Sequence, residues 1–126
     1  MKTILIVEDN EKNMKLVRDI LRHNGHDTIE ATTGGDGVRL ASEKRPDLIL
    51  MDIQLPDIDG IEALSRIRKD AALDAVAVIA VSASVMPDDQ QKIVTSGFDA
   101  FVTKPINLKH FLATVTRCLA NGRAAR

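Results

Sequence analysis

Leu48-Ile49-Leu50-Met51-Asp52 is an uninterrupted apolar run that ends in a carboxylate, just before the turn-prone stretch Gln54-Leu55-Pro56-Asp57. A short, continuously apolar run is typical of a strand covered on both faces of a parallel sheet. A carboxylate at the end of a buried strand is costly in free energy unless that end opens onto a polar site. The stretch therefore predicts a central strand with a functional residue, Asp52, at its carboxyl end.

Three other apolar runs also end in polar side chains, and the polar residues that follow them are Glu8 and Asp9, Ser82, and Lys104. The runs themselves cover residues 4–7, 76–81 and 100–103. If all four runs are parallel strands, their carboxyl ends lie along one edge of the sheet, which is where ligands bind in such folds. We therefore expect three carboxylates, a hydroxyl and an ammonium to meet there.

Segments with the periodicity of an amphipathic helix separate the apolar runs. The clearest is the last, in which Leu108, Phe111, Leu112, Val115 and Leu119 fall on one helical face. The other predicted helices cover residues 12–24, 36–44, 61–67 and 87–97, and a more polar strand at residues 26–31 suits a sheet edge. This alternation predicts an α/β fold with a doubly wound, five-stranded parallel sheet.

Composition excludes several classes of protein. Seventeen basic and eighteen acidic residues give a net charge of -1, so there is no electrostatic footprint for nucleic acid or for an anionic membrane. No apolar run approaches the roughly 20 residues that span a bilayer. A strand begins close to Met1, which leaves no room for a signal peptide, and the single Cys118 fits a reducing compartment. We expect a cytosolic, single-domain protein.

The expected cluster has a definite chemistry. Three neighbouring carboxylates repel one another unless a cation joins them, and oxygen ligands suit Mg²⁺, for which Mn²⁺ can substitute. Mg²⁺ uses one or two carboxylates, which leaves Asp52 in the middle strand as a candidate nucleophile. Lys104 would neutralise an incoming phosphoryl oxygen, and Ser82 could donate a hydrogen bond to another. A purely structural alternative for Asp52 is that it caps the following turn.

The chain resembles the receiver domain of two-component response regulators, and the motifs that carry the resemblance are Glu8-Asp9-Asn10, Leu50-Met51-Asp52-Ile53-Gln54-Leu55-Pro56, Gly60, Ser82-Ala83 and Lys104-Pro105. They occur in the family's order and spacing over essentially the whole chain. The resemblance implies a flavodoxin-like (βα)5 fold with strand order 2-1-3-4-5. It also implies that Asp52 is the phosphoacceptor of a phosphorelay.

Roles for the remaining site residues are implied by the same resemblance. Asp9 would be the main metal carboxylate, Glu8 would act through water, and the backbone carbonyl of Gln54 would complete the protein's metal ligands. Ser82 and Lys104 match the family's switch hydroxyl and lysine. Phe101 stands in the place of the switch aromatic, although a strand phenylalanine is also an ordinary core residue. The Lys104–Pro105 peptide would be cis, the isomer that is affordable before proline.

Residues 1–121 are expected to form the receiver domain and residues 122–126 a short tail without an output domain. In this the chain is similar to stand-alone receivers of the chemotaxis-regulator and, more closely, the DivK cell-division kind. Its expected partners are a sensor histidine kinase or a histidine phosphotransfer protein and a downstream protein target. We expect a monomer or a weak, phosphorylation-dependent dimer. The candidate partner contacts are Asn10, Asn13, Met14, Met86, Pro105 and Ile106.

Two other functions stay open at this point. An aspartate-nucleophile phosphohydrolase would turn over substrate, but such enzymes commonly need a second acid two residues after the nucleophile, where this chain has Gln54. A phosphorylation-independent adaptor would keep the fold without using the acidic site. The complete set of acidic residues argues against the adaptor, and Gln54 argues against the phosphohydrolase.

Overall fold

The structure is a computed structural model that describes residues 2–83 and 86–122. It contains a five-stranded parallel sheet in the order β2-β1-β3-β4-β5, so the predicted fold class and strand order are confirmed. The strands are β1 (Thr3–Val7), β2 (Asp27–Ala31), β3 (Leu48–Asp52), β4 (Ala77–Ser82) and β5 (Ala100–Thr103). The α-helices are α1 (Glu11–His23), α2 (Gly34–Lys44), α3 (Gly60–Ile67), α4 (Pro87–Thr95) and α5 (Leu108–Asn121).

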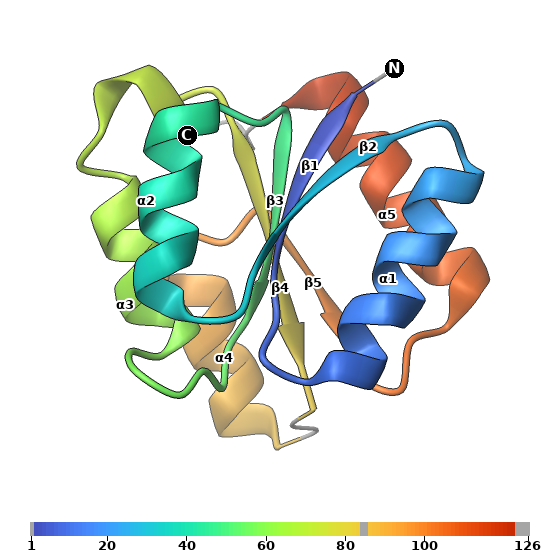
Figure 1. Cartoon of the computed structure of the whole chain (residues 1–126). Coiled ribbons are helices and arrows are strands. Elements are labelled where there is room, and N and C mark those ends of the chain that lie inside the picture. The colour runs from blue at the N-terminus through green and yellow to red at the C-terminus, as the bar shows by residue number, and fades with distance from the viewer. Residues whose placement is uncertain (1, 84–85, 123–126) are drawn as a thin grey trace.

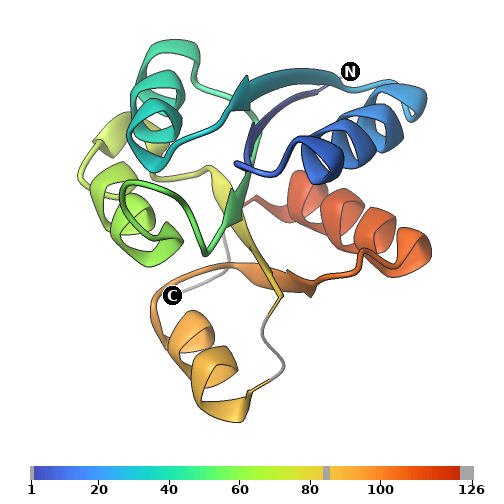
Figure 2. The same ribbon diagram turned by 60° about the horizontal axis from the view of Figure 1, so that its bottom comes forward.

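The helices form a layer on each face of the sheet. Helices α1 and α5 cover one face, and α2, α3 and α4 cover the other (Figures 1 and 2). Alternate residues of β3 belong to different cores: Leu48 and Leu50 pack toward α1 and α5, whereas Ile49 and Met51 pack toward α2 and α3. All five residues of β3 are buried, which is why its sequence is apolar without alternation.

The edge of the sheet at which the strands end holds the candidate site. Because β1, β3, β4 and β5 are parallel and nearly in register, Met51 pairs with Val7, Asp52 with Val81, and Ser82 with Thr103. The polar residues that follow these strands therefore start from neighbouring positions. The more polar β2 lies at the sheet edge, as predicted. Within the described part of the chain, no helix is long and apolar enough to cross a membrane.

Helix α2 begins two residues earlier than the sequence predicts. Its N-cap is Thr33, whose side chain accepts a hydrogen bond from the backbone of Asp36. The carboxylate of Asp57 accepts hydrogen bonds from the backbone nitrogens of Gly34 and Gly35, both at 2.8 Å. These bonds satisfy N–H groups that the first turn of a helix leaves without a partner inside the helix. A contact between distant segments thus extends the helix to Gly34 and Gly35, which precede the predicted range of residues 36–44.

Smaller differences concern the ends of elements. Helix α2 ends at Lys44, as predicted, and Arg45 follows it in the left-handed conformation, with φ of 48°. A short 3₁₀ helix, η1 (Ala71–Leu73), precedes β4 and was not expected from the sequence. Helix α4 ends at Thr95, two residues before Gly97. The predicted tail beyond residue 122 lies outside the described residues.

Gly60, at the start of α3, packs directly against the end of β3. A Cβ atom at this position would lie 2.5 Å from the backbone oxygen of Asp52 and 2.9 Å from the Cα of Ile53. The backbone nitrogen of Gly60 also donates to the oxygen of Ile53 at 2.8 Å. Because the neighbouring atoms belong to the backbone, they cannot move aside without displacing the strand end that carries Asp52.

We therefore expect Gly60→Ala to lower the free energy of unfolding by about 1–3 kcal/mol, the usual cost of overpacking. Urea unfolding followed by far-UV circular dichroism measures this loss. Ser65→Ala, at an exposed position of the same helix, is the matched control and should change stability little. Equal stability of Gly60→Ala and wild type would contradict the close approach.

The contact between Asp57 and α2 makes stability depend on pH. Hydrogen bonds from the backbone of Gly35, Ile58 and Gly34 lower the pKa of Asp57 from 3.8 to about 2. A carboxyl whose pKa is lower in the folded than in the unfolded state stabilises the fold above the unfolded pKa, and this contribution disappears as pH falls through the folded pKa. Asp57→Asn should thus be less stable than wild type at pH 6, and the difference should shrink between pH 4 and pH 2. Urea unfolding across this range measures it, and a difference independent of pH would contradict the contact.

Candidate functional site

Four strands deliver the candidate residues to one edge of the sheet, which Figure 2 brings toward the viewer. Glu8 and Asp9 directly follow β1, Asp52 is the last residue of β3, and Lys104 directly follows β5. One carboxylate oxygen from each of Glu8, Asp9 and Asp52 lies within 4.8 Å of the other two. The structure thus brings together the three acidic residues that the sequence predicted to meet.

The three carboxylates differ in their exposure to solvent. Glu8 and Asp52 are only 3% and 4% exposed, whereas Asp9 is exposed. Two backbone amides hold the buried pair: the nitrogen of Asn10 donates to Glu8 Oε2 and the nitrogen of Gln54 donates to Asp52 Oδ1, each at 3.1 Å. These contacts fix the two side chains without neutralising their charge.

Lys104 supplies the positive charge between the buried acids. Its Nζ lies 3.0 Å from Glu8 Oε1 and 3.1 Å from Asp52 Oδ2. Burial alone would lower the pKa of Lys104, but its hydrogen bond to Glu8 and the charge of Asp52 outweigh burial and raise that pKa above its ordinary value. Lys104 is therefore an ammonium group that bridges the two carboxylates.

One ammonium does not neutralise the cluster. Burial and the nearby Asp52 carboxyl raise the pKa of Glu8 from 4.5 to about 7, although Lys104 and the amide of Asn10 both oppose this shift. Because the neighbouring carboxylates disfavour ionisation of Glu8, a further cation would stabilise the cluster. Because every candidate ligand is an oxygen atom, the site fits a hard divalent cation of the Mg²⁺ kind.

A cleft of about 530 Å³ opens beside Asp52. Its lining residues are Asp9, Asn10, Asn13, Asp52, Gln54, Leu55, Pro56, Ala83 and Lys104. The carboxylate of Asp52 and the ammonium group of Lys104 thus both line this cleft, which is open to solvent. This arrangement suits the binding of a phosphoryl group, whose oxygens carry negative charge.

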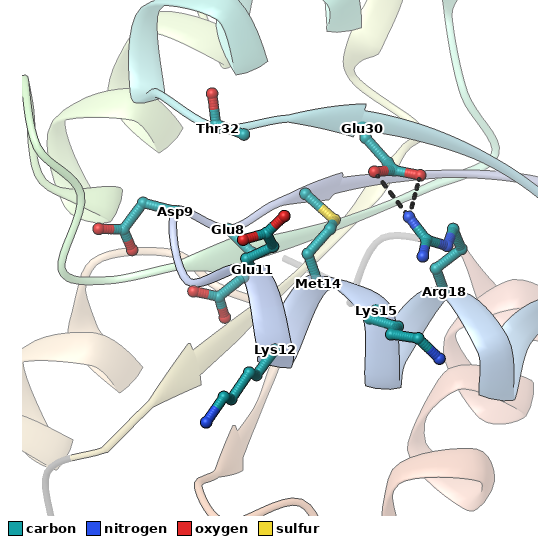
Figure 3. A pocket seen from close by; sticks show the side chains of 9 residues that line it. All are labelled: Glu8, Asp9, Glu11, Lys12, Met14, Lys15, Arg18, Glu30 and Thr32. Carbon is teal, nitrogen blue, oxygen red and sulfur yellow. Dashed lines mark hydrogen bonds and ion pairs between the residues drawn. The ribbon is translucent and has the colours of Figure 1, made fainter.

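A larger groove, of about 640 Å³, lies between α1 and β2 (Figure 3). Asp9 stands at one end of it, and a hydrogen-bonded ion pair between Arg18 and Glu30, at 3.1 Å, stands at the other. Neither Asp52 nor Lys104 lines this groove. We therefore assign the chemistry to the smaller cleft, which contains both.

The switch residues expected from the sequence lie next to the cluster. Ser82 is 5% exposed at the end of β4, and its backbone oxygen accepts a hydrogen bond from the nitrogen of Lys104 at 2.8 Å. Phe101 is half-buried in β5, paired with Ala80 of β4. The Lys104–Pro105 peptide is cis.

The candidate partner contacts divide by exposure. Those with exposed side chains are Asn10, Met86 and Pro105, and those half-buried are Asn13 and Ile106. Met14 differs from the others because it is only 5% exposed and belongs to the core between the sheet and helices α1 and α5. Its side chain also lines the groove between α1 and β2, and its role as a partner contact stays a prediction. Val85, next to Met86, lies outside the described residues.

The sequence analysis missed one residue of the site's surroundings. Asp57 appeared only as part of a turn, yet its carboxylate joins the loop after Asp52 to the start of α2. The one local signal is the pair Gly34-Gly35 after the N-cap Thr33, since glycines at a helix start allow close approach of another segment. Nothing in the sequence pairs that signal with residue 57.

Comparison with known proteins identifies the family. The family model for the response regulator receiver domain matches residues 4–116. The chain is 43% identical over 120 residues to the polar-differentiation response regulator DivK of Brucella anthropi, which covers 95% of this chain and 98% of the relative. DivK of Brucella ovis is 42% identical over 120 residues, and the match again covers 95% of this chain and 98% of the relative.

Solved structures give the same result. The receiver domain of a sensor histidine kinase from Pseudomonas aeruginosa, with a magnesium ion coordinated in its active-site cleft, superimposes with a TM-score of 0.88 at 30% identity, covering 94% of this chain and 98% of that one. A CheY-like receiver domain protein from Methanospirillum hungatei superimposes with a TM-score of 0.86 at 28% identity. The match covers 95% of this chain and 94% of that one. With five parallel strands in the order that the sequence predicts and an acidic cluster at their carboxyl ends, the chain belongs to the response regulator receiver domain family.

Proposed function

We propose that this protein is a single-domain response regulator whose Asp52 accepts a phosphoryl group from a phosphohistidine on a sensor histidine kinase or a histidine phosphotransfer protein. One observation carries the proposal. The Asp52 carboxylate belongs to the acidic cluster and lines the open cleft. It is held between Lys104 Nζ and the backbone nitrogen of Gln54, both at 3.1 Å. Similarity to DivK proteins along nearly their whole length supports signalling through protein contacts.

In the proposed transfer, a carboxylate oxygen of Asp52 attacks the phosphorus atom of the phosphohistidine. The P–N bond breaks, its electron pair stays on the imidazole nitrogen of the donor, and an acyl phosphate forms on Asp52. The backbone amide of Gln54 fixes the orientation of the carboxylate. Lys104 is close enough to Asp52 to donate a hydrogen bond to an oxygen of the phosphoryl group. Phosphoryl transfer needs mainly such positioning and charge stabilisation.

The oxygen-rich donor set supports a Mg²⁺ cofactor, with Mn²⁺ as a substitute. Asp9, Asp52 and the backbone carbonyl of Gln54 would hold the ion directly, and Glu8 through water. When bound, the cation supplies positive charge that offsets the repulsion between the carboxylates and the incoming phosphoryl group. The magnesium ion in the cleft of the Pseudomonas receiver domain supports this assignment, as does the raised pKa of Glu8.

Signalling would follow from the added charge. A phosphoryl group on Asp52 competes with Glu8 for Lys104 and gives the hydroxyl of Ser82 a new acceptor. Both residues adjoin β5, so their rearrangement would shift Phe101 and the surface formed by α4, β5 and α5 between two populations. A downstream protein that binds one population would read the phosphorylation state. Cytosolic location and the absence of an output domain stay predictions.

The acceptor role is tested by intact-mass spectrometry after incubation with acetyl phosphate or phosphoramidate. We expect a single phosphoryl adduct on the wild type that requires Mg²⁺ and is absent from Asp52→Asn. Among the carboxylates of residues 2–83 and 86–122, only Asp52 is buried, contacts Lys104 and lines the cleft. Asp36→Asn, an exposed carboxylate on α2, is the control and should form the adduct normally.

A folded wild type that forms no adduct with these reagents or with a phosphohistidine donor would refute the acceptor role and favour a phosphorylation-independent adaptor. Steady phosphate release from many phosphate esters would instead favour a phosphohydrolase. An adduct that persists in Asp52→Asn would place the acceptor elsewhere.

The cofactor is tested by its effect on stability. A ligand that binds only the folded state adds about 1.4 kcal/mol to the free energy of unfolding at a concentration tenfold above its dissociation constant. We expect Mg²⁺ to produce this rise in the wild type and little in Asp9→Asn, measured by urea unfolding with and without the ion. An equal rise in both proteins would exclude Asp9 as a ligand.

A further inference from the structure

The loop between β3 and α3 is fastened at both ends beside the site. At its start, the nitrogen of Gln54 donates to Asp52 Oδ1 at 3.1 Å. At its end, the nitrogen of Gly60 donates to the oxygen of Ile53 at 2.8 Å, and Gly60 lies against the backbone of Asp52. The loop therefore closes on itself around the strand end, and the backbone of Gln54 moves only if the loop moves.

The middle of the loop is fastened to a different element. Asp57 Oδ1 accepts from the nitrogen of Gly34 and Oδ2 from that of Gly35, each at 2.8 Å, so both oxygens of the carboxylate are used. Beside this contact, a Cβ added to Gly34 would lie 2.5 Å from Cγ1 of Ile58, which shows how closely the loop approaches α2. A carboxylate bound through both oxygens is fixed in orientation as well as position.

We propose that Asp57 is a positioning residue for the cation site, and that it transmits the position of the first turn of α2 to the backbone of Gln54. This inference rests on the proposed function, in which the Gln54 carbonyl is a ligand. Mg²⁺ demands near-ideal octahedral geometry with ligand distances of about 2.0–2.1 Å, so a small displacement of one ligand weakens binding. Asp57 lies three residues after Gln54 in the same closed loop, which makes it the anchor of that ligand.

The coupling acts in both directions. If the contact between Asp57 and α2 strengthens cation binding, then cation binding strengthens that contact by the same factor, because coupling free energies are reciprocal. The first turn of α2 therefore senses occupation of the cleft, although its residues lie outside the cleft lining. A partner that pulls Gly34 and Gly35 away from Asp57 would weaken the cation site.

Asp70 provides a matched control for a merely structural role. Its carboxylate also caps a short segment and also reaches α2: it accepts from the nitrogen of Ala72 at 3.0 Å and from Ser42 Oγ at 2.7 Å. Asp70 lies between α3 and η1, away from the loop that carries Gln54. Substitutions at Asp57 and at Asp70 should both reduce stability, but only those at Asp57 should weaken the affinity for Mg²⁺.

The test is isothermal titration calorimetry of the full chain with Mg²⁺. We expect the dissociation constant to rise about tenfold in Asp57→Ala, which is in the lower part of the usual range for coupling between sites. The rise should be smaller, about threefold, in Asp57→Asn, which keeps one acceptor oxygen. Asp70→Asn and Asp70→Ala should bind as tightly as the wild type. An unchanged dissociation constant in Asp57→Ala, or an equal rise in Asp70→Ala, would overturn the inference.

A spectroscopic measurement tests the same coupling without relying on stability. During a Mg²⁺ titration, the amide resonances of Gly34 and Gly35 should shift in parallel with that of Gln54 in the wild type and cease to respond in Asp57→Ala. Stationary glycine resonances in a wild type that binds Mg²⁺ would overturn this inference and leave the proposed function intact. A wild type that binds no Mg²⁺ at all would defeat the cofactor assignment itself, so the two failures are distinguishable.

Discussion

The burial of two carboxylates beside a single ammonium is the constraint on which the rest of the site depends. Glu8 and Asp52 are almost completely removed from water and share Lys104. Such a group is destabilising unless further positive charge or a proton joins it, and the raised pKa of Glu8 expresses that imbalance. The sheet tolerates the cost because its two apolar cores stabilise the strands that carry these residues. The unrelieved negative charge is also what suits the cleft to a further cation.

The parallel sheet determines where these charged residues lie. Parallel strands in register end at neighbouring points, so residues 8, 52 and 104 meet although the chain separates them widely. The loop after β3 is then held by Gly60 against the strand and by Asp57 against α2. The cleft is therefore bounded on one side by this loop and on the other by the end of β5, next to the surface formed by α4, β5 and α5. At that end of β5, the backbone nitrogen of Lys104 donates a hydrogen bond to the backbone oxygen of Ser82 at 2.8 Å.

Much of this arrangement could be read from the sequence, because apolar runs and their polar ends report burial along the chain. The strands, their carboxyl ends and the acidic cluster follow from residues 4–9 and 48–52, and the motifs added the strand order. Contacts between distant segments do not appear in such patterns. The pairing of Asp57 with Gly34 and Gly35, and with it the true start of α2, depends on two loops meeting in space. Met14, which the sequence suggests as a partner contact, also belongs to the core between the sheet and helices α1 and α5.

The most direct test of the central claim is to locate the phosphoryl group chemically. Borohydride reduces an aspartyl phosphate to homoserine, so peptide mapping by mass spectrometry after phosphorylation and reduction identifies the modified residue. We expect homoserine at position 52 alone, and only in samples that contained both the phosphoryl donor and Mg²⁺. Homoserine at Asp9, Asp57 or any other carboxylate, with Asp52 unchanged, would contradict the assignment of Asp52 as the phosphoacceptor.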